Sequence, residues 1–233
     1  MNQTENISFT PEEKKVIATL DTPRKIHEYL QTQIKYEKQD DMPQEQQTNR
    51  SFRRVLRDKK AHCLEAVFFS AAVMKAHGYL PLFVNLDIFS IDMPHNIYVF
   101  KDKYTGRYGS LAISRDPMLW GRMPAYNTFD DLIDSYYYVY TEYMDIFAAG
   151  NPKDARMTLR GHSAIINLRD YEKKGIDWIL GEENLDMIED DLFKTVYRRL
   201  HSKNGLSKFY KSPNGLNAIK INDKEASKYR FNI

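Results

Sequence analysis

The segment that most constrains the fold of this chain is residues 62–77, HCLEAVFFSAAVMKAH, in which almost every residue is apolar or small. It is too long for a typical strand, and the Gly78 and Pro81 that follow are common where a helix stops. It is too short to span a membrane. The pattern therefore predicts a helix that is buried on most sides, at the centre of a soluble protein. The only cysteine of the chain, Cys63, lies at its start.

Three stretches after this helix predict strands. Residues 81–89, PLFVNLDIF, alternate between two sets of side chains, as a strand with two different faces does. Residues 95–102 and 107–114 continue in the same style around the turn KYTG, which predicts a hairpin. We therefore expect an antiparallel sheet packed against the central helix, in an α+β fold with additional C-terminal helices.

Further helices are expected on both sides of this core. An amphipathic helix is predicted over residues 22–36, with Thr22 as its cap, and another within the basic run 50–60, whose arginines would form a solvated face. Towards the C-terminus, residues 128–147 and a segment that begins near 181–183 show helical spacing.

We expect a single domain over residues 1–233. Its expected parts are a core over about residues 21–117, a helical C-terminal extension over about 124–202 and a weakly structured tail over 203–233. Within the extension, residues 158–172 predict a short irregular or extended piece. The polar stretch 37–50 is expected to be an exposed loop and not a domain linker, because apolar patterning resumes directly after it.

Composition and charge argue against several function classes. Lys and Arg number 34 and Asp and Glu 32, so the net charge of +2 gives no reason to expect a nucleic-acid partner. A single cysteine excludes an intramolecular disulfide, and the first residues do not resemble a signal peptide, so we expect a cytoplasmic protein without membrane contact. His162 and His201 have no partners at metal-ligand spacing and no glycine-rich phosphate loop occurs, so neither a metal nor a cofactor is expected.

Cys63 is placed where a cysteine becomes reactive. A thiol in the first turn of a helix lies at the positive end of the helix dipole, beside unpaired backbone N–H groups, which lowers its pKa. Lys59 and Lys60 are expected to add positive charge nearby. The same N–H groups would stabilise an oxyanion on a carbonyl that the sulfur attacks. The alternative is that Cys63 is a small core residue, as a lone cysteine on an apolar helix commonly is.

A cysteine nucleophile also needs a base. His95 is the candidate, because it opens the second predicted strand, on the face that it shares with Ile97 and Val99. His62 directly precedes the cysteine, but neighbouring positions on a helix diverge by about 100°, so we expect it to face a different surface.

The hairpin register decides which side chain orients this base. If the connection is the two residues 105–106, His95 lies opposite Asp116; if it is the four residues 103–106, His95 lies opposite Ser114. Asp116 is the better orienting group, because a carboxylate stabilises the imidazolium that forms when the thiol loses its proton. A bulge in the hairpin would break this count.

These residues resemble the transglutaminase-like superfamily. The resemblance rests on a cysteine at the start of a buried helix, the segment GYLPLFVNLDIF after it, the histidine that opens the next strand and the RDP that ends the one after. The upstream DTPRKIHEYLQTQIKY is similar to the helix that precedes the catalytic core in that superfamily, so the similarity covers about residues 21–117. Two later stretches, PAYNTFDDLIDSYYYVY and TLRGHSAIINL to WILGEENLDMIED, look similar to the C-terminal part of uncharacterised bacterial members.

The resemblance implies a papain-like fold with a Cys-His-Asp triad. Cys63 would be the nucleophile, His95 the general base and Asp116 the orienting group, with Ser114 still open as its substitute. The implied activity is acyl transfer from the amide bond of a protein, peptide or small amide. With water as the acceptor the protein is a peptidase or amidase, which the lack of a secretion signal and of a calcium-type carboxylate cluster favours slightly; with an amine it is a transglutaminase.

A second function class stays open. The same fold would serve as a non-catalytic binding module in which Cys63 and His95 only pack. The two classes differ in geometry, because a catalytic site requires the Cys63 sulfur within about 4 Å of a ring nitrogen of His95, under an open cleft. The sequence decides neither the substrate nor the oligomeric state.

Overall fold

The computed structural model describes residues 8–39, 42–88, 94–137, 159–200, 207–211 and 219–233. The first elements are α1 (Pro11–Thr19), α2 (Pro23–Gln33), β1 (Lys35–Tyr36), η1 (Gln44–Gln46), α3 (Phe52–Asp58), β2 (Lys60–Ala61), α4 (Cys63–Ala76) and β3 (Leu82–Ile88). They are followed by β4 (His95–Lys101), β5 (Tyr108–Leu111), η2 (Pro117–Leu119), β6 (Leu159–Ser163), β7 (Ile166–Asn167), α6 (Arg169–Glu172), α7 (Asp186–Lys194), β8 (Tyr197–Arg199), β9 (Phe209–Lys211), β10 (Ile219–Ile221) and α8 (Asp223–Ala226). Residues 129–137 are also helical.

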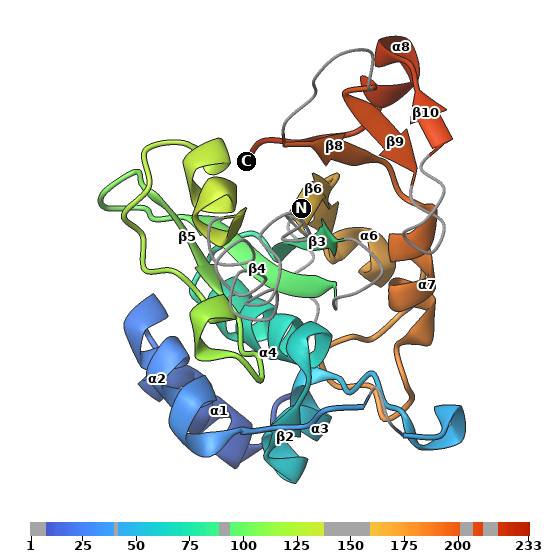
Figure 1. Cartoon of the computed structure of the whole chain (residues 1–233). Helices are drawn as coiled ribbons and strands as arrows, with labels where there is room; N and C mark the ends of the chain where they lie inside the picture. The colour runs from blue at the N-terminus through green and yellow to red at the C-terminus, as the bar shows by residue number, and fades with distance from the viewer. Residues whose placement is uncertain (1–7, 40–41, 89–93, 138–158, 201–206, 212–218) are drawn as a thin grey trace, which may run out of the picture.

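The fold is α+β, built on the antiparallel sheet that the sequence predicts. The strand order is β10-β9-β8-β6-β3-β4-β5, every neighbouring pair is antiparallel, and β7 also pairs with β3. Figure 1 shows α1 and α2 at one end of the molecule and β8, β9, β10 and α8 at the opposite end. In the hairpin β4–β5, Val99 lies opposite Ser110. This is the register of the four-residue connection, so the two-residue alternative is wrong.

The predicted central helix is α4. It begins at Cys63, and every side chain from Leu64 to Met74 is buried. On one side α4 packs on the sheet, against a core that includes Tyr98. After its end Gly78 has a φ of 79°, a left-handed conformation that favours glycine, so the predicted helix stop is confirmed.

The predicted alternation along β3 is confirmed by two separate cores. Phe83 packs into the core on the α4 side of the sheet, whereas Val84 and Leu86 pack into a second core on the other side. The helical residues 129–137 cover this second face. Thr128 caps them, because its Oγ1 accepts the Asp131 N–H at 3.0 Å. The remainder of the helix predicted over residues 128–147 lies outside the described residues.

The N-terminal helices follow the sequence patterns closely. Thr22 caps α2 by accepting the N–H of Lys25, and Pro23 occupies the first turn. In α3 the apolar residues of the basic run are buried, which confirms the amphipathic helix. The stretch 37–50 differs from the exposed loop that we expected. Several of its polar side chains are buried: Gln39, Asn49 and Arg50.

The C-terminal half differs most from the sequence prediction. Within the extension over 124–202, β6 lies in the piece over 158–172 that we expected to be irregular or extended, but β8 lies where we expected helix. The tail from 203 is not weakly structured where it is described, since β9, β10 and α8 lie there. These strands are only three to five residues long. Segments of that length show little periodicity, and their pairing with distant strands supplies the order.

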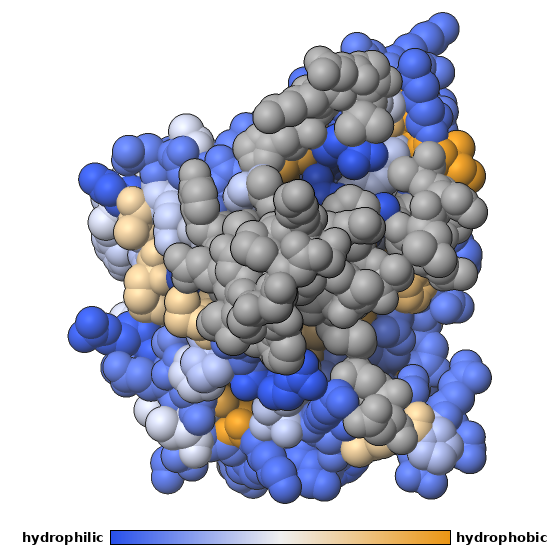
Figure 2. Space-filling view, in the orientation of Figure 1, coloured by the Kyte–Doolittle hydropathy of each residue, from blue (hydrophilic) through white to orange (hydrophobic). Residues whose placement is uncertain are grey.

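The surface carries scattered apolar residues. On the face in Figure 2 the described surface is mainly hydrophilic, with small separate hydrophobic areas. Within the described residues, no helix has the length and apolar character that a membrane crossing requires.

Candidate active site

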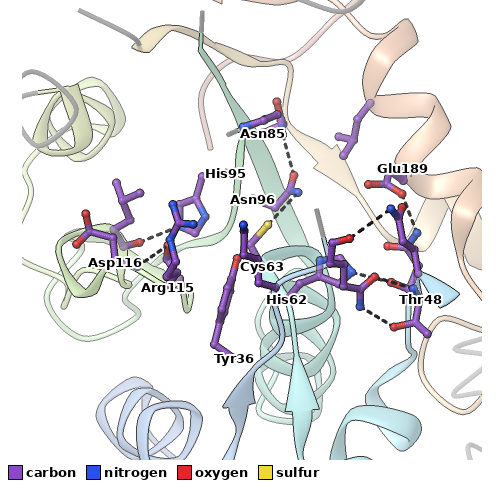
Figure 3. A pocket seen from close by; sticks show the side chains of 18 of the residues that line it. Tyr36, Thr48, His62, Cys63, Asn85, His95, Asn96, Arg115, Asp116 and Glu189 are labelled. Atoms are coloured by element: carbon purple, nitrogen blue, oxygen red, sulfur yellow. Dashed lines mark hydrogen bonds between the residues drawn. The ribbon is translucent and has the colours of Figure 1, made fainter. Parts of the chain in front are cut away.

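A cavity of about 480 Å³ opens at the N-terminal end of α4. Its walls come from the loop before α3, the first turn of α4, the middle of β3, the start of β4, the segment after β5, α7 and β8. Figure 3 shows the Cys63 sulfur near the middle of this cavity, between His95 on one side and His62 on the other. The sheet and α4 therefore place a thiol and two imidazoles at one accessible point.

Cys63 is the first residue of α4 and is partly exposed. Burial raises the pKa of its thiol, but hydrogen bonds and charges from His62 and His95 outweigh burial and hold that pKa well below its ordinary value. The helix dipole acts in the same direction. The geometry therefore favours a thiolate, which is the nucleophilic form of cysteine.

The two lysines before the cysteine, Lys59 and Lys60, interact with other side chains and not with the thiol. The ammonium of Lys59 donates to the hydroxyl of Tyr29 at 2.7 Å, and that of Lys60 lies 3.3 Å from the carboxylate of Glu37. The imidazoles, and not these lysines as we expected, are the main cations that lower the pKa of the Cys63 thiol.

His95 is a buried imidazole at the first position of β4, opposite Leu86 of β3. Its Nε2 lies 2.8 Å from the backbone carbonyl of Leu119. A carbonyl only accepts, so Nε2 carries the hydrogen and the lone pair of the neutral ring is at Nδ1. The ring also packs against Tyr136. With Nε2 occupied in this way, Nδ1 is the nitrogen available to the thiol.

The structure places a backbone carbonyl where we expected the side chain of Asp116 or Ser114. Asp116 lines the same cavity, but its carboxylate accepts the N–H of Met118 at 2.9 Å. The hydroxyl of Ser114 accepts the N–H of Asp116 at 3.2 Å. β5 ends at Leu111, before the strand reaches a position opposite His95.

After β5 the chain leaves the sheet, forms η2 and returns beside it. On return, Gly121 donates its N–H to the Ala112 carbonyl at 3.0 Å. A Cβ at Gly121 would lie 2.6 Å from the Ser110 carbonyl oxygen, so the two segments approach too closely for a larger residue. This loop carries the Leu119 carbonyl to the ring of His95.

His62 lies beside the thiol, so the expectation that it faces another surface is wrong. It is the N-cap of α4, with extended dihedral angles (φ −92°, ψ −176°), and the 100° step between helical neighbours does not apply to a residue outside the helix. Its Nδ1 accepts the N–H of Leu64 at 3.3 Å, and its Nε2 donates to the Thr48 carbonyl at 2.8 Å.

The charge state of His62 follows from its neighbours. Burial lowers its pKa, but the hydrogen bond to Cys63 and the charge of Glu65 outweigh burial and raise the pKa to about 9. A neutral ring caps the helix through Nδ1, whereas a charged ring has no lone pair to accept the Leu64 N–H and stabilises the thiolate by its charge. At neutral pH the sulfur therefore has a cationic neighbour.

Glu65 ties the loop before α3 to the first turn of α4. Its side chain is fully buried and accepts hydrogen bonds from Thr48 Oγ1 (2.8 Å), the Arg50 N–H (2.8 Å) and the His62 N–H (3.0 Å). The guanidinium of Arg50 lies 3.1 Å from it and 2.7 Å from Glu37. This network explains why the stretch that we expected to be exposed is partly buried.

A third side chain reaches the sulfur. Nδ2 of Asn96 lies 3.6 Å from the Cys63 sulfur. Asn96 was not among the predicted site residues, although a signal exists: it is a polar residue on a strand face that is otherwise aromatic, with Tyr98 and Phe100.

The cavity carries both charges and apolar walls. On α7, Glu189 accepts a hydrogen bond from Asn49 at 2.8 Å, and Phe193 lines the wall one turn further on. Arg115 lies on the side of His95 (Figure 3). Within the described ranges, no group of three or more His, Cys, Asp or Glu is arranged to hold a metal ion.

Comparison of the sequence with models of known protein families gives no match, and comparison with curated proteins gives none either.

Proposed function

We propose that this chain is a cysteine-dependent acyl-transfer enzyme of papain- or transglutaminase-like design. The observation that carries the proposal is the placement of Cys63 at the start of a buried helix, in an accessible cavity, next to an imidazole with a fixed tautomer. An inert core cysteine needs neither a cavity nor an oriented histidine. The lowered pKa of the Cys63 thiol supports the same role.

In the proposed reaction, Cys63 attacks the carbonyl carbon of an amide. Nδ1 of His95 takes the thiol proton and later gives it to the leaving amine, so a thioester and a free amine result. His62 stabilises the thiolate by its charge. The N–H of Cys63, at the first position of α4, is not used by the helix and is available to the oxyanion.

We further propose that water is the second acceptor, which makes the protein a peptidase- or amidase-type hydrolase. Water attacks the thioester carbonyl, His95 accepts its proton, and the acid leaves as Cys63 is regenerated. A protein, peptide or small amide suits a cavity of about 480 Å³ with charged groups at both ends and an apolar wall. Transfer to an amine, as in a transglutaminase, is the alternative second step, and product analysis with and without added amine separates the two.

Alkylation of the native protein tests the thiol–imidazole pair. Because the chain has one cysteine, iodoacetamide reports on Cys63 alone. The wild-type rate should already be close to its maximum at pH 7, whereas an ordinary thiol is only half ionised at about pH 8.5 and still gains reactivity above that pH. His95→Ala should shift this profile to higher pH. A thiol that reacts slowly and equally in both proteins would contradict the pair.

Acylation of Cys63 tests the proposed acyl-transfer activity directly. With p-nitrophenyl acetate, wild type should release one equivalent of p-nitrophenol in a burst, followed by slower turnover, and Cys63→Ala should give no burst. A wild-type protein that is alkylated rapidly but never acylated would favour the non-catalytic binding module instead.

A further inference from the structure

Three buried polar side chains form a hydrogen-bonded row across the sheet. They come from three strands, Asn96 from β4, Asn85 from β3 and Tyr197 from β8, and all three are buried. Tyr98, two residues along β4 from Asn96, belongs to the hydrophobic core beneath α4. Burying polar groups in such a core costs free energy unless they are paired. The row ends at the Cys63 sulfur (Figure 3).

Each hydrogen bond of the row is donated in the same direction, from Tyr197 towards Asn96. The hydroxyl of Tyr197 donates to Oδ1 of Asn85 at 3.2 Å and is shared with the Leu192 carbonyl at 3.1 Å. Asn85 donates from Nδ2 to Oδ1 of Asn96 at 3.1 Å. Since each carboxamide oxygen accepts within the row, Nδ2 of Asn96 is the atom turned to the sulfur. The row therefore fixes the orientation of the Asn96 carboxamide.

The position of Nδ2 suits an oxyanion better than it suits the sulfur. Sulfur is a weak acceptor, and 3.6 Å is a long contact to it. When an acyl carbon is bonded to the Cys63 sulfur, its oxygen lies one bond further out, where a donor beside the sulfur reaches it at about 3 Å. The N–H of Cys63 offers a second donor at the same end of the cavity.

We propose that Asn96 is a further catalytic residue, whose carboxamide donates to the substrate carbonyl oxygen as Cys63 attacks. The thiolate sulfur forms a bond to the carbonyl carbon, and one carbonyl bonding pair moves to the oxygen. The pair then returns, the bond to the leaving group breaks, and that group takes the proton held on His95. Asn85 and Tyr197 are positioning residues that act through Asn96. This inference rests on the proposed acyl transfer.

Two reactions of the Cys63 thiol distinguish donation by Asn96 to the carbonyl oxygen from an effect of Asn96 on the reactivity of the thiolate itself. Alkylation by iodoacetamide forms no oxyanion, whereas acylation by p-nitrophenyl acetate passes through one. Asn96→Ala should lower the acylation rate about 100- to 1,000-fold. Measured at a pH where the thiol is fully ionised, its alkylation rate should stay within about threefold of wild type. The side chain of serine is too short to reach the oxygen, so Asn96→Ser should behave as Asn96→Ala does. It replaces Asn96→Ala if that variant does not fold.

Two further variants serve as matched controls. Asn167→Ala removes a carboxamide from β7 of the same sheet, outside the row, and should leave both rates at wild-type values. Tyr197→Phe removes only the hydroxyl that orients Asn85, so it should lower acylation by a smaller factor, about tenfold, with alkylation unchanged.

The outcomes are distinct for each proposal. If Asn96→Ala lowers acylation and alkylation in the same proportion, Asn96 acts only on the thiolate and its assigned role is wrong. Unchanged acylation in Asn96→Ala overturns the role as well. If wild type itself is alkylated but not acylated, the proposed acyl transfer fails, and the role of Asn96 fails with it.

Discussion

Two imidazoles lower the pKa of one thiol in this protein, and they are held in different ways. His95 is anchored through Nε2 to the Leu119 carbonyl, which leaves Nδ1 as a base. His62 is anchored through Nε2 to the Thr48 carbonyl, and its pKa is raised to about 9. In the proposed reaction, His95 therefore transfers the proton and His62 stabilises the thiolate.

The raised pKa of His62 predicts how stability depends on pH. Its folded pKa lies above the ordinary value of about 6.5, so its contribution is complete below pH 6.5 and is lost as pH rises through about 9. His62→Asn supplies an uncharged N-cap, as the neutral ring of His62 does, and removes the charge. Urea unfolding should show wild type more stable than His62→Asn by on the order of 2 kcal/mol at pH 6, with the difference closing by pH 10. A constant difference across this range would contradict the raised pKa.

At the scale of elements, the loop between β5 and Gly121 determines what orients the base. The register of the β4–β5 hairpin would place Ser114 opposite His95, but β5 ends at Leu111 and the loop supplies the carbonyl of Leu119. A carbonyl holds the tautomer of the ring without the full charge of a carboxylate. In the proposed site, the Leu119 carbonyl therefore takes the place that we expected for the Asp116 carboxylate.

Asp116→Asn tests this arrangement. Because Asp116 bonds to Met118 and not to His95, the substitution should lower the acylation rate with p-nitrophenyl acetate by less than about tenfold. Replacing the carboxylate of a working triad typically costs about 10⁴-fold. A loss of that size, without loss of folding by circular dichroism, would restore Asp116 as the orienting group.

At the scale of the whole molecule, the two halves of the chain share one sheet. β3 has β4 on one side and β6 on the other. One neighbour therefore precedes residues 138–158 in the chain and the other follows them. β6 in turn pairs with β8, where the backbone passes close to Gly161. A Cβ on Gly161 would lie 2.3 Å from the Arg198 carbonyl oxygen.

Gly161→Ala should therefore weaken the whole protein and not only its C-terminal strands. We expect a loss of about 1–3 kcal/mol in the free energy of unfolding, from overpacking at the β6–β8 contact. Because the sheet is shared, circular dichroism and the fluorescence of the buried Trp178, measured in a Trp120→Phe background, should report one coincident transition in urea. A separate early transition that leaves Trp178 buried would contradict a single cooperative unit.

The features that the sequence predicted are those with a long local pattern. α4 and the strands β3 and β4 follow from periodicity, because each buries a face of its own over many residues, and β5 follows from the turn residues that join it to β4. The position of Cys63 at the start of a helix follows in the same way. The strands β8 and β9 have no such pattern, and the pairing of β6, β8 and β9 with distant strands was not predictable from local sequence.

The sequence by itself determined the α+β class, the buried helix and its cysteine, and the histidine that opens β4. Tertiary structure alone decided what contacts that cysteine. The anchors of both imidazoles are backbone carbonyls, of Leu119 and Thr48, and a carbonyl has the same chemistry in every residue, so no residue type signals it. The Asn96 row crosses strands from distant parts of the chain, and only the assembled sheet brings its amide to the sulfur.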